Sequence, residues 1–140
     1  MPKSVLSSQF IIKNALLASR LAKKVGNRLS IHGMNLSEYL LLDALDGTDQ
    51  KALSRIELAE LLGMSASGIT RMVAPMEKLG WIEKEANPRD ARQSLVKLSQ
   101  VGQKLYNDAQ VTFSETADAL SEDLTPEQLA KMIDAYAEIH

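Results

Sequence analysis

The chain opens with a segment in which apolar side chains recur every three or four residues. Phe10, Leu17 and Leu21 belong to this series, and basic side chains gather on the opposite side. Such a period is that of an amphipathic helix. The spacing therefore predicts a long first helix, which ends within the segment 30–34.

A second helix is predicted from residue 35 onward. Asn35 can cap its first turn, and Glu38, three positions later, completes the pattern of a capping box. The polar residues 46–50 then indicate a loop. The expected buried face of this helix consists of Leu36, Leu40, Leu41 and Leu45.

Two short helices follow in close succession. Ser54 and Glu57 form a second capping box, and Gly63 suits the left-handed residue at which the first of these helices ends. Ser65 can cap the next helix, which runs through Leu79. Two short helices joined by so tight a turn form a helix-turn-helix. The expected inward-facing positions are Leu58, Ala59, Leu62, Ile69, Val73, Met76 and Leu79.

A β-hairpin is predicted directly after this motif. Residues 81–86 and 94–98 have the composition of two short strands, and the second of them alternates in polarity. Between them lies a polar tip that contains a proline, residues 87–93. The expected fold class is therefore mainly α with a small β-hairpin wing, a winged helix-turn-helix flanked by further helices.

Two more helices complete the chain. Ser99 can cap a long one, and Thr125, Pro126 and Gln128 mark the start of the last one. Their apolar faces consist of Leu105, Ala109, Phe113, Ala117 and Leu120, and of Leu129, Met132, Ile133, Tyr136 and Ile139. These faces and the first helix carry more apolar surface than a compact winged core can cover. We therefore expect a homodimer.

These elements predict two functional regions. Residues 1–34 and 100–140 are expected to form a helical dimerisation region, and residues 35–99 a winged helix-turn-helix region for DNA binding. Both regions belong to one continuous domain, because no linker-like or low-complexity segment separates them.

Composition excludes several classes of protein. The 140 residues include no cysteine, so neither a disulfide nor a thiolate metal site can form within the chain. The longest apolar run, residues 39–42, is far too short to span a membrane, and the N-terminus lacks the apolar core of a signal peptide. We therefore expect a cytoplasmic protein without membrane contact.

Catalytic residues are also scarce. His32 and His140 are the only histidines, and the chain has neither a glycine-rich phosphate loop nor the spacing of metal ligands. The sequence therefore predicts no enzyme, no catalytic or metal site, and no cofactor.

Charge is distributed unevenly around a net charge of −2. Residues 1–35 include six basic side chains and no acidic one, whereas residues 106–140 include eight acidic side chains and one basic one, Lys131. Such asymmetry lets one surface meet phosphate groups while another stays away from them.

A recognition helix must expose small or polar side chains at its N-terminal turns, because those turns enter the major groove and read base edges. The helix that follows Ser65 meets this requirement, and Arg71 is its best candidate for a base or phosphate contact. The candidate DNA-binding residues of this helix are Ser65, Ser67, Gly68, Thr70 and Arg71.

The wing tip supplies the remaining DNA-binding candidates, Arg89, Asp90 and Arg92. An arginine suits a narrow minor groove, because its guanidinium is permanently charged and is attracted by the enhanced negative potential there. Asp90 would repel phosphate by itself. Its expected role is to pair with an arginine and to hold the tip in shape.

Four segments together resemble the MarR family of bacterial transcription regulators. Their order and spacing match those of the family across the winged core, and the flanking helices match its dimerisation helices. The segments are LGMS to TR (62–71), MEKLGWIEK (76–84), NPRDAR (87–92) and VKLSQVG (96–102). Asn87 stands where the family often has an aspartate.

The resemblance implies a homodimer that binds double-stranded DNA sequence-specifically, each subunit reading half of a pseudo-palindromic operator. It also implies a repressor that releases DNA when a small aromatic or phenolic effector binds between the dimerisation and DNA-binding parts. Candidate residues for that effector site are Arg20, His32, Met34 and Tyr39.

A second interpretation is a winged helix that serves as a protein–protein adaptor without binding DNA, because a fold does not dictate its function. The wing favours DNA, since an adaptor has no need for Arg89 and Arg92 on a polar tip beside an exposed recognition turn. Retention on duplex DNA that weakens with salt would distinguish the two.

Overall fold

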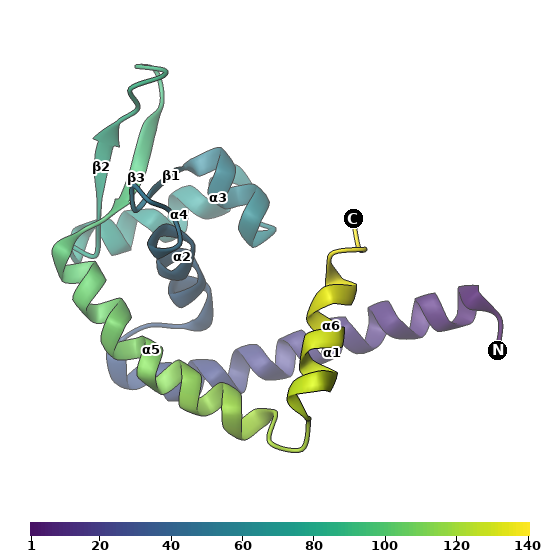
Figure 1. Ribbon diagram of the computed structural model, residues 1–140. Helices are drawn as coiled ribbons and strands as arrows, with labels where there is room; N and C mark the ends of the chain where they lie inside the picture. Colours follow the sequence, from purple (N-terminus) through teal and green to yellow (C-terminus); the bar gives the residue numbers. More distant parts are fainter.

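Six α-helices and a small sheet make up the chain, and a computed structural model describes all of residues 1–140 (Figure 1). The elements are α1 (Lys3–Leu29), a 3-10 turn η1 (Ser30–His32), α2 (Leu36–Asp46), β1 (Ala52–Ser54), α3 (Arg55–Leu62), α4 (Ala66–Lys78), β2 (Ile82–Ala86), β3 (Ser94–Leu98), α5 (Gln100–Leu120) and α6 (Pro126–Tyr136). The predicted fold class, mainly α with a hairpin wing, is confirmed.

The predicted helix starts are confirmed by their hydrogen bonds. At α2, the Asn35 side chain accepts from the backbone N–H of Glu38, and the Glu38 side chain accepts from the backbone N–H of Asn35. The starts of α3 and α6 have the same reciprocal pair. These bonds satisfy backbone donors that a helix leaves free in its first turn. Local sequence thus determines where these helices begin.

The sheet has one strand more than the sequence predicted. β1 follows the loop after α2 and pairs antiparallel with β3, which also pairs with β2, so that the strand order is β1-β3-β2. Leu53 of β1 and Lys84 of β2 both lie opposite Val96. A strand of three residues is too short to show alternation, which is why the pattern missed it.

One core joins the winged part to the ends of two flanking helices. α2 lies at its centre and contacts α1, α3, α5 and the sheet. Leu40 and Leu79 were expected on buried faces, but they are 39% and 59% exposed. Tyr39 and Leu42, which were not expected on the buried face of α2, are buried. Because α2 has neighbours on several sides, a single buried stripe described it poorly.

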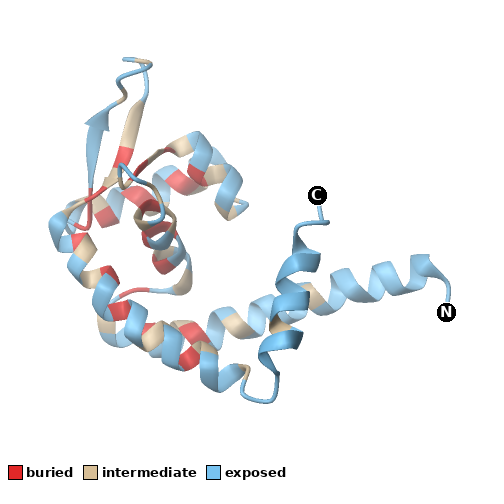
Figure 2. Ribbon diagram, in the orientation of Figure 1, coloured by how far each residue is buried: buried red, intermediate tan, exposed pale blue.

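The outer parts of α1 and α6 are barely covered (Figure 2). α1 buries only Val25 and Leu29, near its C-terminal end, where it packs against α5, and α6 buries no residue. In Figure 1, both helices lie away from the wing, at the far end of α5. None of the helices combines the length and apolar character that crossing a membrane requires.

Candidate nucleic-acid interface

The first turn of α4 is held by its cap. The hydroxyl oxygen of Ser65 accepts a hydrogen bond from the backbone N–H of Gly68 at 3.0 Å, and it lies 3.2 Å from the hydroxyl oxygen of Ser67. A Cβ at Gly68 would come within 3.1 Å of that capping oxygen. The structure therefore brings together three of the predicted residues at the exposed start of this helix.

The two sides of α4 differ in burial. Ile69, Val73 and Met76 are buried in the core. Thr70 and Arg71 are exposed, and the Thr70 hydroxyl donates to the carbonyl of Ala66 at 3.2 Å. The Arg71 guanidinium forms no ion pair within the chain, so it is free to meet an anion.

The wing tip is shaped by two side-chain turns. The side-chain oxygen of Asn87 accepts from the backbone N–H of Arg89, and the carboxylate of Asp90 accepts from the backbone N–H of Arg92, both at 3.0 Å. Such turns fix the backbone of a polar loop without a core of its own. Asn87 thus offers an oxygen acceptor where the family often has an aspartate.

Asp90 also pairs with Arg92, as the sequence predicted for one of the wing arginines. Its Oδ1 lies 3.6 Å from the Arg92 Nε, and the Arg92 side chain is 94% exposed. An ion pair so exposed contributes little to stability. Arg89 is exposed as well and forms no ion pair, so the tip presents two guanidinium groups to solvent.

A polar junction that the sequence did not reveal connects α5 to α2. The hydroxyl of Tyr106 donates to the carboxylate of Asp43 at 2.5 Å, and the side-chain amide of Gln103 donates to Asp46 at 2.9 Å. Burial and the Asp43 carboxylate raise the pKa of Tyr106 far above its usual range. The bonds from Gln103 and then Lys51 lower the pKa of Asp46. These side chains lie far apart in sequence, so only the fold shows the contact.

The four predicted effector residues lie in different surroundings within the single chain. Met34 and Tyr39 belong to the core, where the Tyr39 ring stacks on that of Phe113 with centroids 4.4 Å apart. His32 Nε2 lies 2.7 Å from the hydroxyl of Thr112 on α5, and Arg20 is exposed on α1.

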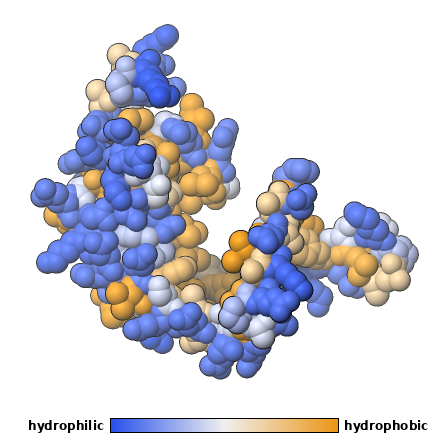
Figure 3. Space-filling view, in the orientation of Figure 1, coloured by the Kyte–Doolittle hydropathy of each residue, from blue (hydrophilic) through white to orange (hydrophobic).

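The largest apolar hollow lies elsewhere, between α1, α2, α5 and α6, and we call it the apolar groove. Its volume is about 540 Å³, and all but one of its lining residues are hydrophobic. Figure 3 shows hydrophobic surface in the hollow between the winged part and α6. Its walls include Leu17, Leu21, Leu40, Phe113, Met132 and Ile133.

Comparison with known proteins finds similarity to one family. A model of the MarR family matches residues 32–93, which include both helices of the helix-turn-helix and most of the wing. Over these residues the chain is similar to the MarR family. Among its curated relatives is the transcriptional repressor MprA of Escherichia coli K12, 26% identical over 92 residues. That match covers 66% of this chain and 52% of the relative, so the chain spans about half the length of the curated relatives it matches.

Solved structures of MarR family proteins share the whole fold. A transcriptional regulator from Streptomyces coelicolor, solved in complex with DNA, is 26% identical and superposes with a TM-score of 0.79 over 95% of this chain and 87% of its own. CouR from Rhodococcus jostii, solved with bound p-coumaroyl-CoA, is 19% identical and has a TM-score of 0.84 over 96% of this chain and 93% of its own. The flanking helices are therefore part of the MarR family fold.

Proposed function

We propose that the chain is a sequence-specific regulator of transcription that binds double-stranded DNA as a homodimer. The observation that carries this proposal is the presence, on one buried core, of an exposed polar helix start at Ser65 and a wing tip with two exposed arginines. A helix can enter the major groove, and arginines suit the minor groove. The regulator from Streptomyces coelicolor that was solved with DNA has the same fold.

Each candidate contact has a distinct task in this proposal. Arg71 reads a base edge or neutralises a phosphate, and Ser65, Ser67 and Thr70 at the same helix start position the backbone. Arg89 and Arg92 enter or border the minor groove, and Asp90 holds the tip in the conformation that aims them. Residues 35–99 thus form the DNA-binding region.

The homodimer is proposed from the uncovered apolar surface of residues 1–34 and 100–140. In a single chain the apolar groove is open, and Phe10, Ile133 and Tyr136 are between 42% and 65% exposed. A second copy would cover this surface, as in interfaces of about 2,000 Å² or more that leave no stable folded monomer. Two-fold symmetry would then place two recognition helices about 34 Å apart, which matches an inverted-repeat operator.

Repression released by a small molecule is the proposed mode of action. MprA carries the name of a repressor, and CouR was solved with p-coumaroyl-CoA bound. An aromatic or phenolic effector that prefers one dimer geometry would change the distance between the two recognition helices and so the affinity for DNA. The regulator would need neither catalysis nor a cofactor, and it would act in the cytoplasm.

Recovery and sequencing of the genomic fragments that the purified protein retains would give both the operator and its targets. On that operator, Arg71→Ala should cost on the order of 1 to 3 kcal/mol of specific binding and relax the preference at one base pair.

Arg89→Ala should weaken binding and, where the side chain contacts a phosphate, lower the salt dependence by about one ion per subunit. A wild-type protein that retains no duplex DNA at low salt would instead support the protein–protein adaptor.

A further inference from the structure

We propose that Arg55 and Arg92 together hold one phosphate of the DNA backbone, in a cleft between the start of α3 and the wing. This inference rests on the proposed function and adds to it a contact by Arg55, which lies outside the recognition helix and the wing tip. The cleft has a volume of about 200 Å³. Its walls are Ser54, Arg55, Ile56, Arg92, Gln93 and Ser94, which we call the arginine cleft.

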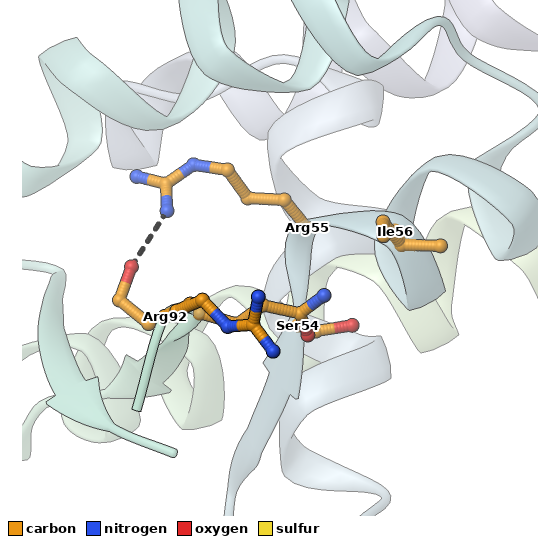
Figure 4. A pocket seen from close by; sticks show the side chains of 6 residues that line it. Ser54, Arg55, Ile56 and Arg92 are labelled. Atoms are coloured by element: carbon orange, nitrogen blue, oxygen red, sulfur yellow. Dashed lines mark hydrogen bonds between the residues drawn. The ribbon is translucent and has the colours of Figure 1, made fainter. Parts of the chain in front are cut away.

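Arg55 bridges the two sides of the arginine cleft. It is the first residue of α3, and its Nη1 donates to the hydroxyl of Ser94, the first residue of β3, at 3.0 Å. Figure 4 shows its side chain extended across the cleft while Arg92 lies at the same opening. The side chain of Arg55 is half-buried, so its position is set by packing rather than left to solvent.

The positive charge in the arginine cleft is only partly neutralised within the chain. Arg55 forms no ion pair, and Arg92 has only the 3.6 Å contact with Asp90 at the exposed tip. The nearest carboxylate along α3, that of Glu57, accepts from the backbone N–H of Ser54 in the capping box. A guanidinium has five N–H donors, and Arg55 uses one of them here. Unpaired arginines with donors to spare are suited to bind phosphate.

The place of the cleft explains why the phosphate would belong to DNA. In helix-turn-helix proteins the first helix of the motif crosses the backbone while the second enters the major groove. The wing is directed at the minor groove, and a single sugar–phosphate strand separates adjacent grooves. A cleft between the first helix and the wing therefore lies where that strand has to pass. A phosphate there would connect the helix-turn-helix to the wing.

The test compares salt dependence between variants of the full-length protein. The probe is a fluorescently labelled duplex of mixed sequence, because a phosphate contact does not depend on the bases. Arg55→Gln and Arg92→Gln should each lower the slope of log affinity against log salt by about 1 per subunit. The double variant should lower it by no more than either single variant, because both side chains are needed to hold the one phosphate.

Two controls keep the result specific. Lys131→Gln removes one positive charge from α6, far from the wing, and should leave the slope unchanged. Arg55→Lys keeps the charge but loses the two-pronged geometry, so it should keep the slope and bind more weakly. Thermal melts of each variant should match the wild type, which separates lost contacts from lost folding.

The outcomes distinguish this inference from the proposed function. If the wild type binds no duplex, the proposed function fails. If the wild type binds and Arg55→Gln keeps the wild-type slope, only the arginine cleft is wrong. A slope that falls by about 2 per subunit in the double variant would assign the arginines to separate phosphates and overturn the shared site. Inorganic phosphate that shifts the Arg55 Nε–H resonance, while Arg55→Gln leaves DNA binding intact, would show a site for free phosphate and would also overturn it.

Discussion

The winged part and the outer helices, α1 and α6, differ in how far their apolar residues are buried. In the winged part, Leu58, Ile69 and Met76 are fully buried although their helices are short. In α1 and α6, which are amphipathic, most apolar side chains stay exposed, among them Ile12 and Ile133. A soluble monomer rarely exposes a large contiguous apolar patch. The difference supports the proposal that the winged part is complete within one chain and that a second copy covers the outer helices.

The largest expected effect is loss of the dimer when a charge is placed on α6. Ile133 is 65% exposed in the single chain and lines the apolar groove. Ile133→Asp should therefore convert the dimer to a monomer and abolish tight operator binding, because a charge would be buried without a partner in the interface. Sedimentation velocity measures the change.

The matched control is Leu61→Asp, since Leu61 is 64% exposed and lies on α3. Its substitution should leave the protein a dimer. Dissociation of both variants, or of neither, would contradict a partner-covered groove.

In the winged part, removal of a buried side chain should lower the stability of the fold, because it leaves a cavity in the core. Ile69 is fully buried on α4, so Ile69→Ala should lower the free energy of unfolding by about 2 to 5 kcal/mol. Ile31→Ala, at a position that is 76% exposed, is the control and should change it by less than about 0.5 kcal/mol. Urea denaturation measures both. Equal losses would mean that α4 is rotated differently about its axis.

Two glycine positions sharpen the comparison, because the same substitution should change stability in opposite directions where α5 meets the winged part and on the outer helix α1. A Cβ at Gly102, where α5 meets the winged part, would lie 1.9 Å from the carbonyl oxygen of Trp81. Gly102→Ala should therefore destabilise the protein by about 1 to 3 kcal/mol. Nothing lies within 4 Å of a Cβ at Gly26 in α1, so Gly26→Ala should stabilise by about 0.5 to 1 kcal/mol. Melting temperatures that move in the same direction would refute this packing.

The smallest expected effect concerns pH at the junction of the two regions. Hydrogen bonds from Gln103 and Lys51 lower the pKa of Asp46 below its unfolded value of 3.8. The stabilisation from this carboxylate is therefore complete above that value and is lost as the pH falls through the lower folded-state pKa. Asp46→Asn should reduce stability at neutral pH, and the difference from wild type should shrink in acid. Asp49→Asn, in the same turn and without an ion pair, is the matched control for urea titrations at several pH values.

Features that depend on neighbouring residues could be predicted from the sequence, and features that depend on long-range contacts could not. Caps such as Asn35 and Thr125 are determined by neighbouring residues, so the helix starts were predictable, as were the hairpin and the exposed side of α4. Strand β1 and the contact of Tyr106 with Asp43 depend on segments distant along the chain. The stacking of Tyr39 against Phe113 also joins segments distant along the chain, so only the fold shows it.

Arg55 shows why part of the candidate DNA interface was missed. In the sequence it is simply the residue after a helix cap, and nothing in its neighbours indicates Arg92 or Ser94. The antiparallel pairing of β1 with β3 brings the start of α3 beside the wing. Strand pairing therefore creates a shared cleft that no local pattern could indicate.

Light scattering coupled to size-exclusion chromatography tests the central claim most directly. The full-length protein is measured at micromolar concentration. The claim is that the outer helices of two chains cover each other and so place two winged parts on one DNA site. It predicts a mass of twice the 15.4 kDa of one chain, and two chains for each operator duplex when DNA is added. A mass of 15.4 kDa, or one chain bound tightly to a full operator, would contradict it.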